Sequence, residues 1–113
     1  MATITESDCI AGVYVVEPVI HGDQRGLFVE TYRREWIPGS APMVQANRAD
    51  RQATCLVGLH YHLHQADYWY VPFGRARVVL HDLRAASPTE GATLCFDLGT
   101  RADGTHDFTG LVP

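Results

Sequence analysis

Residues 54–64 read TCLVGLHYHLH, and apolar and polar side chains alternate along most of this stretch. Because successive side chains of a strand point to opposite faces, the alternation predicts a half-buried strand. One face would carry the apolar side chains from Cys55 to Leu63, which we expect to pack. The opposite face would carry His60, His62 and His64 in a row. Three imidazoles on one face favour a catalytic or metal site over a solvated strand face.

Short β-rich runs recur on both sides of this stretch, separated by residues that accept turn geometry. This spacing of short runs predicts an all-β sandwich or barrel. A helical turn is expected at one place only, from Arg33 to Trp36. No repeat, low-complexity tract or flexible linker divides the chain, so we expect a single domain over residues 1–113. The other runs are 12–20, 27–32, 43–47, 67–71, 76–82 and 93–98.

The chain has 113 residues, of which 46% are apolar, and carries a formal net charge of -4. Charges of both signs are interspersed, which argues against nucleic acid and anionic membranes as partners and favours a small metabolite. The three cysteines, Cys9, Cys55 and Cys95, form no paired motif. The N-terminus lacks a signal-peptide pattern, and no stretch approaches the ~18 apolar residues of a spanning helix. We therefore expect a soluble protein of the reducing cytoplasm.

Five short blocks occur in order over nearly the whole chain: Asp23-x-Arg25-Gly26-x-Phe28-x-Glu30, Val44-Gln45-Ala46-Asn47, Gly58-Leu59-His60-Tyr61, Gln65-Ala66 and Asp82-Leu83-Arg84-x-x-Ser87-Pro88-Thr89. Together they resemble the dTDP-4-dehydrorhamnose 3,5-epimerase family. Members of that family are cupins, which are double-sheet jelly rolls. The resemblance therefore implies an all-β cupin, a double-stranded β-helix.

The resemblance also implies proton chemistry on a dTDP-linked 4-keto-6-deoxy sugar, without a cofactor. In that chemistry a base removes the hydrogens next to the carbonyl at C3 and C5 and returns them on the opposite face. His60 stands where the family has this base. An imidazole suits the role because the group ordinarily titrates near neutral pH, where general base catalysis is most effective. The family further implies a homodimer, since its members pair through their sheets and edge strands need covering.

Five further residues form the substrate site that the resemblance implies. Arg25 suits a diphosphate, Phe28 would stack on the nucleotide base, and Glu30 is a third nucleotide contact. Gln45 and Asn47 would make polar contacts to the sugar and phosphate. From residue chemistry alone, Arg25 and Glu30 could equally form a surface ion pair, and Phe28 could be an ordinary core residue.

The chain departs from the family pattern at three positions. Val57 stands where the family usually has an arginine, Asp67 where it has a lysine, and Val78 where it often has an aspartate. A carboxylate about 4 Å from an enolate oxygen would oppose its formation by roughly 4 kcal/mol at an effective dielectric constant of about 20. Residues 110–113 resemble the start of a further family motif, so we expect a jelly roll that is truncated in its C-terminal part or a chain that is incomplete.

Two other interpretations remain. His60-x-His62, Asp67 and Gly74 also resemble the first metal-binding motif of cupins, and two imidazoles with a carboxylate suit iron, manganese or zinc. Metal binding would exclude His60 as a free base, because its lone pair would be coordinated. The altered residues also fit a non-catalytic module that binds a nucleotide sugar or serves in dimerisation.

Overall fold

The computed structural model describes residues 2–37 and 39–113, which consist almost entirely of strands and loops. A turn of 3-10 helix, η1 (Arg34–Trp36), confirms the predicted helical turn. Within the described ranges, no helix has the length and hydropathy of a membrane span. The predicted all-β class is confirmed. The strands are β1 (Thr3–Glu6), β2 (Tyr14–Glu17), β3 (Ile20–Asp23), β4 (Gly26–Val29), β5 (Trp69–Tyr70), β6 (Arg75–His81), β7 (Thr93–Gly99) and β8 (Gly110–Val112).

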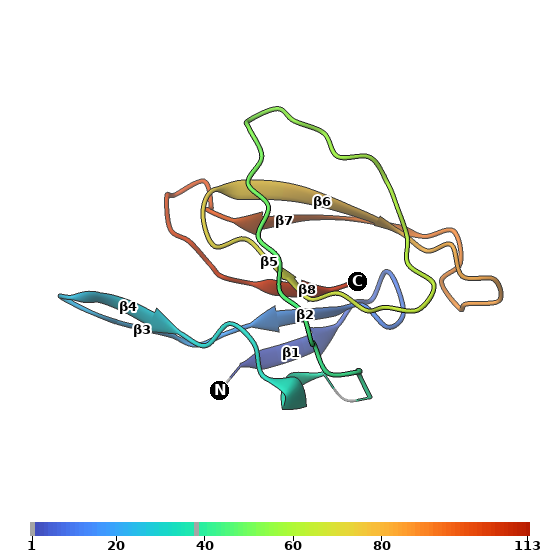
Figure 1. The fold of residues 1–113 in the computed structure, drawn as a ribbon, viewed down its shortest axis with the longest axis horizontal. Coiled ribbons are helices and arrows are strands. Elements are labelled where there is room, and N and C mark those ends of the chain that lie inside the picture. The colour runs from blue at the N-terminus through green and yellow to red at the C-terminus, as the bar shows by residue number, and fades with distance from the viewer. Residues whose placement is uncertain (1, 38) are drawn as a thin grey trace.

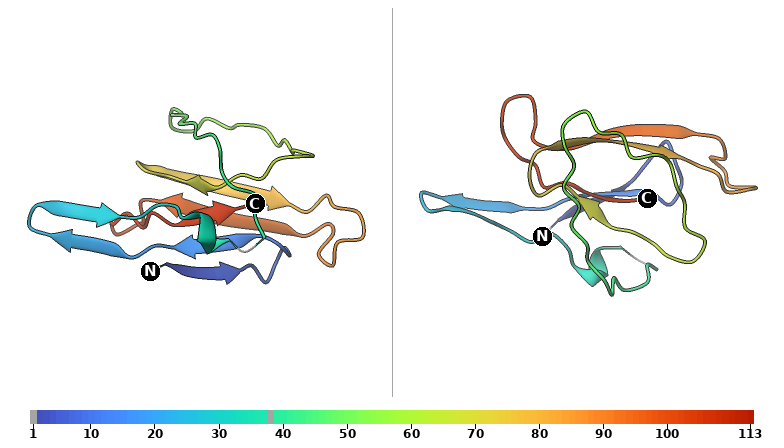
Figure 2. Two further views of the ribbon diagram at one scale, coloured as in Figure 1. Left: turned by 60° about the horizontal axis from the view of Figure 1, so that its bottom comes forward. Right: turned by 45° about the horizontal axis from the view of Figure 1, so that its top comes forward.

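These strands form a four-stranded antiparallel sheet and two separate two-stranded ribbons. The sheet has the order β1-β2-β8-β5, and the ribbons are β3–β4 and β6–β7. The β6–β7 ribbon lies over one side of the sheet, and η1 lies on the other side (Figure 1). The β3–β4 ribbon extends away from the end of the sheet, as two further views also show (Figure 2). Its residues are mostly exposed, so it is an arm of the molecule rather than part of the core.

The main core lies between the four-stranded sheet and the β6–β7 ribbon. Leu111 of β8 is 0% exposed and Leu98 of β7 is 1% exposed, and both belong to one apolar cluster with Ile10 and Val13. Full burial of a side chain of this size contributes about 1.5–3 kcal/mol relative to exposure. Alternate residues of the ribbon add partly buried side chains to the cluster, and Val78 is one of them. An apolar residue at position 78 therefore suits this core.

A second, smaller core covers the opposite side of the sheet. Val16 of β2 and Val112 of β8 are buried there with Trp36 and Ile37. Because neighbouring residues of a strand face opposite sides, Leu111 enters the main core while Val112 enters the second. The short strand β8 therefore contributes to both cores, and η1 is anchored through Trp36.

Two glycines permit close approaches around this centre. A Cβ at Gly110 would overlap the hydroxyl of Tyr68, and a Cβ at Gly99 would overlap the carbonyl oxygen of Gly74. Gly99 also has a φ of +98°, which other residues rarely adopt. Burial raises the pKa of Tyr68 to about 12, so its ring lies against β8 in the neutral form.

The loop after β6 is organised around the buried carboxylate of Asp82. Its oxygens accept hydrogen bonds from Arg84 Nε (2.9 Å), Ser87 Oγ (2.7 Å) and Thr89 Oγ1 (2.8 Å). The Arg84 hydrogen bond is the largest of the effects that hold the pKa of Asp82 well below its usual range. Arg84 Nη2 also donates to the carbonyl oxygen of Ala11 at 2.6 Å, which ties the loop to the segment before β2. The last of the five sequence blocks therefore has a structural role.

The predicted strands at 43–47 and 54–64 are wrong. No strand forms in the described chain between residues 39 and 68, which runs as the long green loop of Figure 1. Leu59 is 81% exposed and Tyr61 is 69% exposed, so the expected apolar face does not pack. Alternation determines which face a side chain takes, but a strand also needs a neighbour to satisfy its backbone N–H and C=O groups. The histidines therefore do not form a row on a strand.

Replacing Asp82 tests the role of its loop. We expect Asp82→Asn to lower the midpoint of thermal unfolding by several degrees at neutral pH, because Arg84 and two hydroxyls lose a charged acceptor. Calorimetry on both proteins checks this. Asp50→Asn is a matched control, since Asp50 pairs with Arg48 at an exposed position, where ion pairs contribute little. Equal midpoints for the two variants would contradict the role of Asp82.

Acid should weaken the β6–β7 ribbon through Asp97. Hydrogen bonds from Arg77, the larger cause, and from Arg75 lower the pKa of this carboxyl to about 2. A carboxyl with a lowered folded pKa stabilises the fold above its unfolded pKa of about 3.9, and the contribution is lost as the pH falls toward the folded pKa. We expect the urea midpoint to fall between about pH 4 and pH 2, and to fall less steeply in Asp97→Asn. Parallel curves for the two proteins would contradict this contribution.

Candidate functional site

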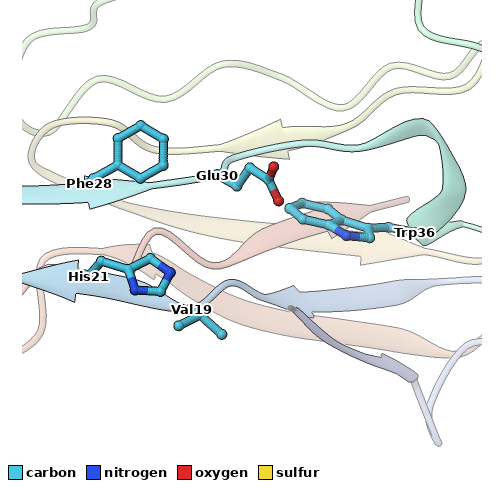
Figure 3. A pocket seen from close by; sticks show the side chains of 5 residues that line it. All are labelled: Val19, His21, Phe28, Glu30 and Trp36. Atoms are coloured by element: carbon cyan, nitrogen blue, oxygen red, sulfur yellow. The ribbon is translucent and has the colours of Figure 1, made fainter.

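Two adjoining hollows lie along the exposed β3–β4 ribbon. One hollow has a volume of about 150 Å³ and is lined by Val19, His21, Phe28, Glu30 and Trp36. The other has a volume of about 400 Å³ and is lined by the residues of the hairpin tip. His21 and Phe28 line both hollows, because they lie directly opposite each other on the two strands. Figure 3 shows these two rings on neighbouring strands, with Glu30 and Trp36 to one side of them.

The turn of this hairpin is set by Asp23. Asp23 and Gly26 are paired across the strands, which leaves Gln24 and Arg25 as the turn residues. The Asp23 Oδ1 accepts a hydrogen bond from the backbone N–H of Arg25 at 2.8 Å, an arrangement typical of aspartate in turns. The guanidinium of Arg25 donates to Oδ2 at 2.7 Å, and this contact is the main cause that lowers the pKa of Asp23. The Arg25 side chain is 86% exposed, so it remains accessible to an anion.

The opposite end of the ribbon is held by Arg33. Its Nη1 donates to Glu30 Oε2 at 2.9 Å, and its Nε donates to Glu35 Oε1 at 2.6 Å. Trp36 lies beside Glu30 and is itself buried in the second core. Each end of the ribbon therefore carries a cation paired with carboxylate, but the balance differs: Arg25 faces one carboxylate, Asp23, whereas Arg33 is shared by two, Glu30 and Glu35.

Arg25, Phe28 and Glu30, three of the predicted substrate-binding residues, thus come together on one short ribbon. Phe28 is 70% exposed, so it is not the core residue that its apolar side chain alone would suggest. The ion pair of Arg25 is made with Asp23 rather than with Glu30. Gln45 and Asn47 lie elsewhere, in the exposed segment after η1, where Gln45 Nε2 donates to Asn47 Oδ1 at 3.4 Å.

The predicted base lies in the same irregular segment. The rings of His60 and His62 meet edge to face, with their centroids 5.3 Å apart. His62 Nε2 is 3.7 Å from Asp67 Oδ2. The Asp67 carboxylate also accepts hydrogen bonds from Gln65 Nε2 at 3.0 Å and from Trp69 Nε1 at 3.2 Å. Local donors therefore satisfy this carboxylate.

The proposed metal ligands His60, His62 and Asp67 do not form a coordination site. Across residues 2–37 and 39–113, no group of three or more His, Cys, Asp or Glu side chains is placed to hold a metal ion. The distance of 3.7 Å between His62 Nε2 and Asp67 Oδ2 would suit a weak ion pair. The metal interpretation therefore gains no support from the arrangement of these side chains.

Sequence reasoning missed three residues that line the smaller hollow, Val19, His21 and Trp36. His21 could have been found from the turn, because an aspartate-bounded two-residue loop fixes the register and puts position 21 opposite position 28. Trp36 carried no such signal. Its position depends on the packing of η1 against the sheet, which involves residues far apart in the sequence.

Comparison with solved structures identifies the fold as that of the epimerase cupins. The chain aligns with dTDP-4-dehydrorhamnose 3,5-epimerase from Elizabethkingia anophelis NUHP1 with a TM-score of 0.58 and 19% identity, over 98% of this chain and 61% of that one. The enzyme of the same name from Bacillus anthracis str. Ames, with TDP and PPi bound, gives a TM-score of 0.56 and 19% identity, over 99% and 65%.

Sequence comparison gives the family. The profile described as dTDP-4-dehydrorhamnose 3,5-epimerase matches residues 7–105. The spore coat polysaccharide biosynthesis protein SpsL of Bacillus subtilis is 37% identical over 90 residues, which are 80% of this chain and 59% of that protein. The dTDP-4-dehydrorhamnose 3,5-epimerase of Pseudomonas aeruginosa is 36% identical over 88 residues, 73% of this chain and 49% of that enzyme. The chain belongs to the dTDP-4-dehydrorhamnose 3,5-epimerase family, and spans roughly half to two thirds of the length of these relatives.

Removing the Asp67 carboxylate should leave the indole N–H of Trp69 without its partner. We expect Asp67→Ala to reduce the free energy of unfolding by about 1 kcal/mol. Gln65→Ala is the control, because it removes an exposed donor and keeps the bond to Trp69, and we expect a change below about 0.5 kcal/mol. Urea unfolding curves measure both. An Asp67→Ala protein as stable as the wild type would show that the bond to Trp69 contributes nothing.

Proposed function

We propose that this chain acts as a dTDP-4-dehydrorhamnose 3,5-epimerase, with a dTDP-linked 4-keto-6-deoxy sugar as substrate. The observation that carries the proposal is that Arg25, Phe28 and Glu30 line two adjoining hollows of the β3–β4 ribbon, with Phe28 common to both. These are the residues that the family pattern assigns to the nucleotide. The relative from Bacillus anthracis, whose structure contains TDP, supports the same class of ligand.

The exposed aromatic ring of Phe28 and the guanidinium of Arg25 suit the two halves of a nucleotide. A flat ring that is not packed in the core is available to stack on a base. A guanidinium offers several donors in a fixed plane that matches phosphate oxygens. In the proposed complex Arg25 exchanges its contact with Asp23 for the diphosphate, and Gln45 and Asn47 contribute amide contacts.

The proposed chemistry is proton transfer at the carbons next to the 4-keto group. The His60 imidazole takes the proton from C3, and the electrons of the C–H bond move into an enolate whose charge lies on the carbonyl oxygen. A solvent proton delivered to the opposite face inverts the carbon, His60 releases the proton it took to solvent, and the same sequence at C5 completes the reaction. No electrons are gained or lost, so the reaction requires no redox cofactor.

We propose a homodimer as the functional form and the cytoplasm as its location. Among the described residues no further strand pairs with the β3–β4 ribbon, and Ile20 and Leu27 expose apolar side chains on it. Covering such edges and side chains is a common reason for pairing. The cysteines of the described chain are free thiols, which is compatible with a reducing compartment.

A second candidate is a module that binds the nucleotide sugar without turnover. It is favoured by the position of His60, which lies in an exposed segment, whereas the hollow of the ribbon is lined by residues 19–36. Departures from the family pattern at Val57 and Asp67 point the same way.

Exchange of substrate hydrogens in deuterated water separates the two candidates. With the dTDP-4-keto-6-deoxy sugar, we expect the C3 and C5 proton signals to decay by NMR in the presence of the wild type. His60→Asn should slow this exchange by about a hundredfold or more, because general base catalysis contributes at least that much. His64→Asn is the control, since His64 is an exposed histidine of the same segment. Binding without exchange would replace the epimerase proposal with the binding module.

A further inference from the structure

His21 is one of the two ribbon residues, with Phe28, that line both hollows. It pairs with Phe28 across the strands, and both rings line the hollow beside Trp36 and the hollow at the hairpin tip. A ligand that fills both hollows must therefore pass over these two rings. His21 is exposed, so its ring nitrogens are accessible to such a ligand.

The charges around His21 define how a nucleotide would lie. Arg25 is at the tip of the hairpin, whereas Glu30 is at the other end and is joined to Arg33. The Arg25 guanidinium is exposed and held by one carboxylate, so it can turn to a diphosphate, whereas Arg33 at the other end is held by two carboxylates, Glu30 and Glu35. The phosphates therefore belong at the tip and the nucleoside belongs toward Trp36. The five residues from Gly26 to Glu30 span roughly 13 Å in an extended chain, which is about the length of a nucleoside diphosphate. His21 then lies at the junction of the two parts.

We propose that His21 is a nucleotide-binding residue whose ring N–H donates a hydrogen bond to a phosphate oxygen while Phe28 supports the base. This inference rests on the proposed function and extends it, because it adds a donor between the base and Arg25. An aspartate on the same strand face, Asp23, is engaged by Arg25 in the free protein. When Arg25 turns from Asp23 to the diphosphate, two groups donate to the phosphates: the Arg25 guanidinium and the ring N–H of His21.

An ordinary structural role would have a different signature. Facing rings on paired strands stabilise a hairpin through contact between their side chains, whatever ligand is present. The phenylalanine variant His21→Phe keeps a ring of similar size at this position but has no N–H to donate. It therefore separates binding of phosphate from stabilisation of the ribbon.

Calorimetric titration with thymidine 5′-diphosphate and with thymidine tests the inference. We expect His21→Phe to weaken binding of the diphosphate by about tenfold, as loss of one hydrogen bond to a charged group predicts, and to change thymidine binding less than twofold. His21→Gln keeps an N–H donor and should recover part of the loss. His81→Ala is the control, because His81 is an exposed histidine of β6 that bonds to Thr93. Thermal melts of every variant verify that the fold is kept.

The outcomes distinguish this inference from the function on which it rests. If the wild type binds the diphosphate, Arg25→Ala weakens binding and His21→Phe does not, the role of His21 is overturned while the nucleotide site stands. Equal losses for thymidine and its diphosphate in His21→Phe would also overturn it, because they would indicate a structural role. If the wild type binds neither probe, the proposed function and the role of His21 fail together.

Discussion

The burial of β8 between β2 and β5 is the constraint on which the fold depends. Leu111 has no exposed surface and packs in the main core, while its neighbour Val112 packs in the second core with Trp36. Three residues thus join the β6–β7 ribbon on one side of the sheet to η1 on the other. Gly110 completes this arrangement, since only a residue without a Cβ leaves room for the ring of Tyr68. The strands β2 and β8, which pair Val16 with Gly110, are held together in this way although they lie at opposite ends of the chain.

The candidate site lies outside both cores, so burial in a core does not explain the side chains that it carries. The β3–β4 ribbon lies outside both apolar clusters, so packing does not determine which side chains it carries. Because the Phe28 ring is exposed, the free protein lacks the free energy that burial of this ring would contribute. A ligand that covers the ring would gain that free energy. Trp36 connects the two regions, because it packs in the second core and also lines the hollow. The ribbon can therefore be held in place without being buried.

Local signals were sufficient for part of this structure. The helical turn at Arg34–Trp36 and the strands β6 and β7 were recognisable because each depends on neighbours in the sequence. The turn between β3 and β4 was also recognisable, although most of β3 itself was not predicted as a strand. The strands β1 and β8 were missed, since their burial depends on partners that are remote along the chain. Residues 54–64 show the alternation of apolar and polar side chains that is typical of a strand, but this alternation does not supply a partner strand. In the site, the family pattern indicated Arg25, Phe28 and Glu30, whereas His21 required the register of the ribbon.

The central claim is that the β3–β4 ribbon, with the exposed guanidinium of Arg25 at its tip, is the nucleotide-binding surface of this epimerase-family chain. An amide NMR titration of the wild type with thymidine 5′-diphosphate tests it most directly, because it locates the ligand without altering any residue. We expect the largest shifts at residues 19–30, with His21, Arg25 and Phe28 among the most affected. Shifts concentrated instead at residues 58–67, or absent from the ribbon at saturating ligand, would contradict the claim.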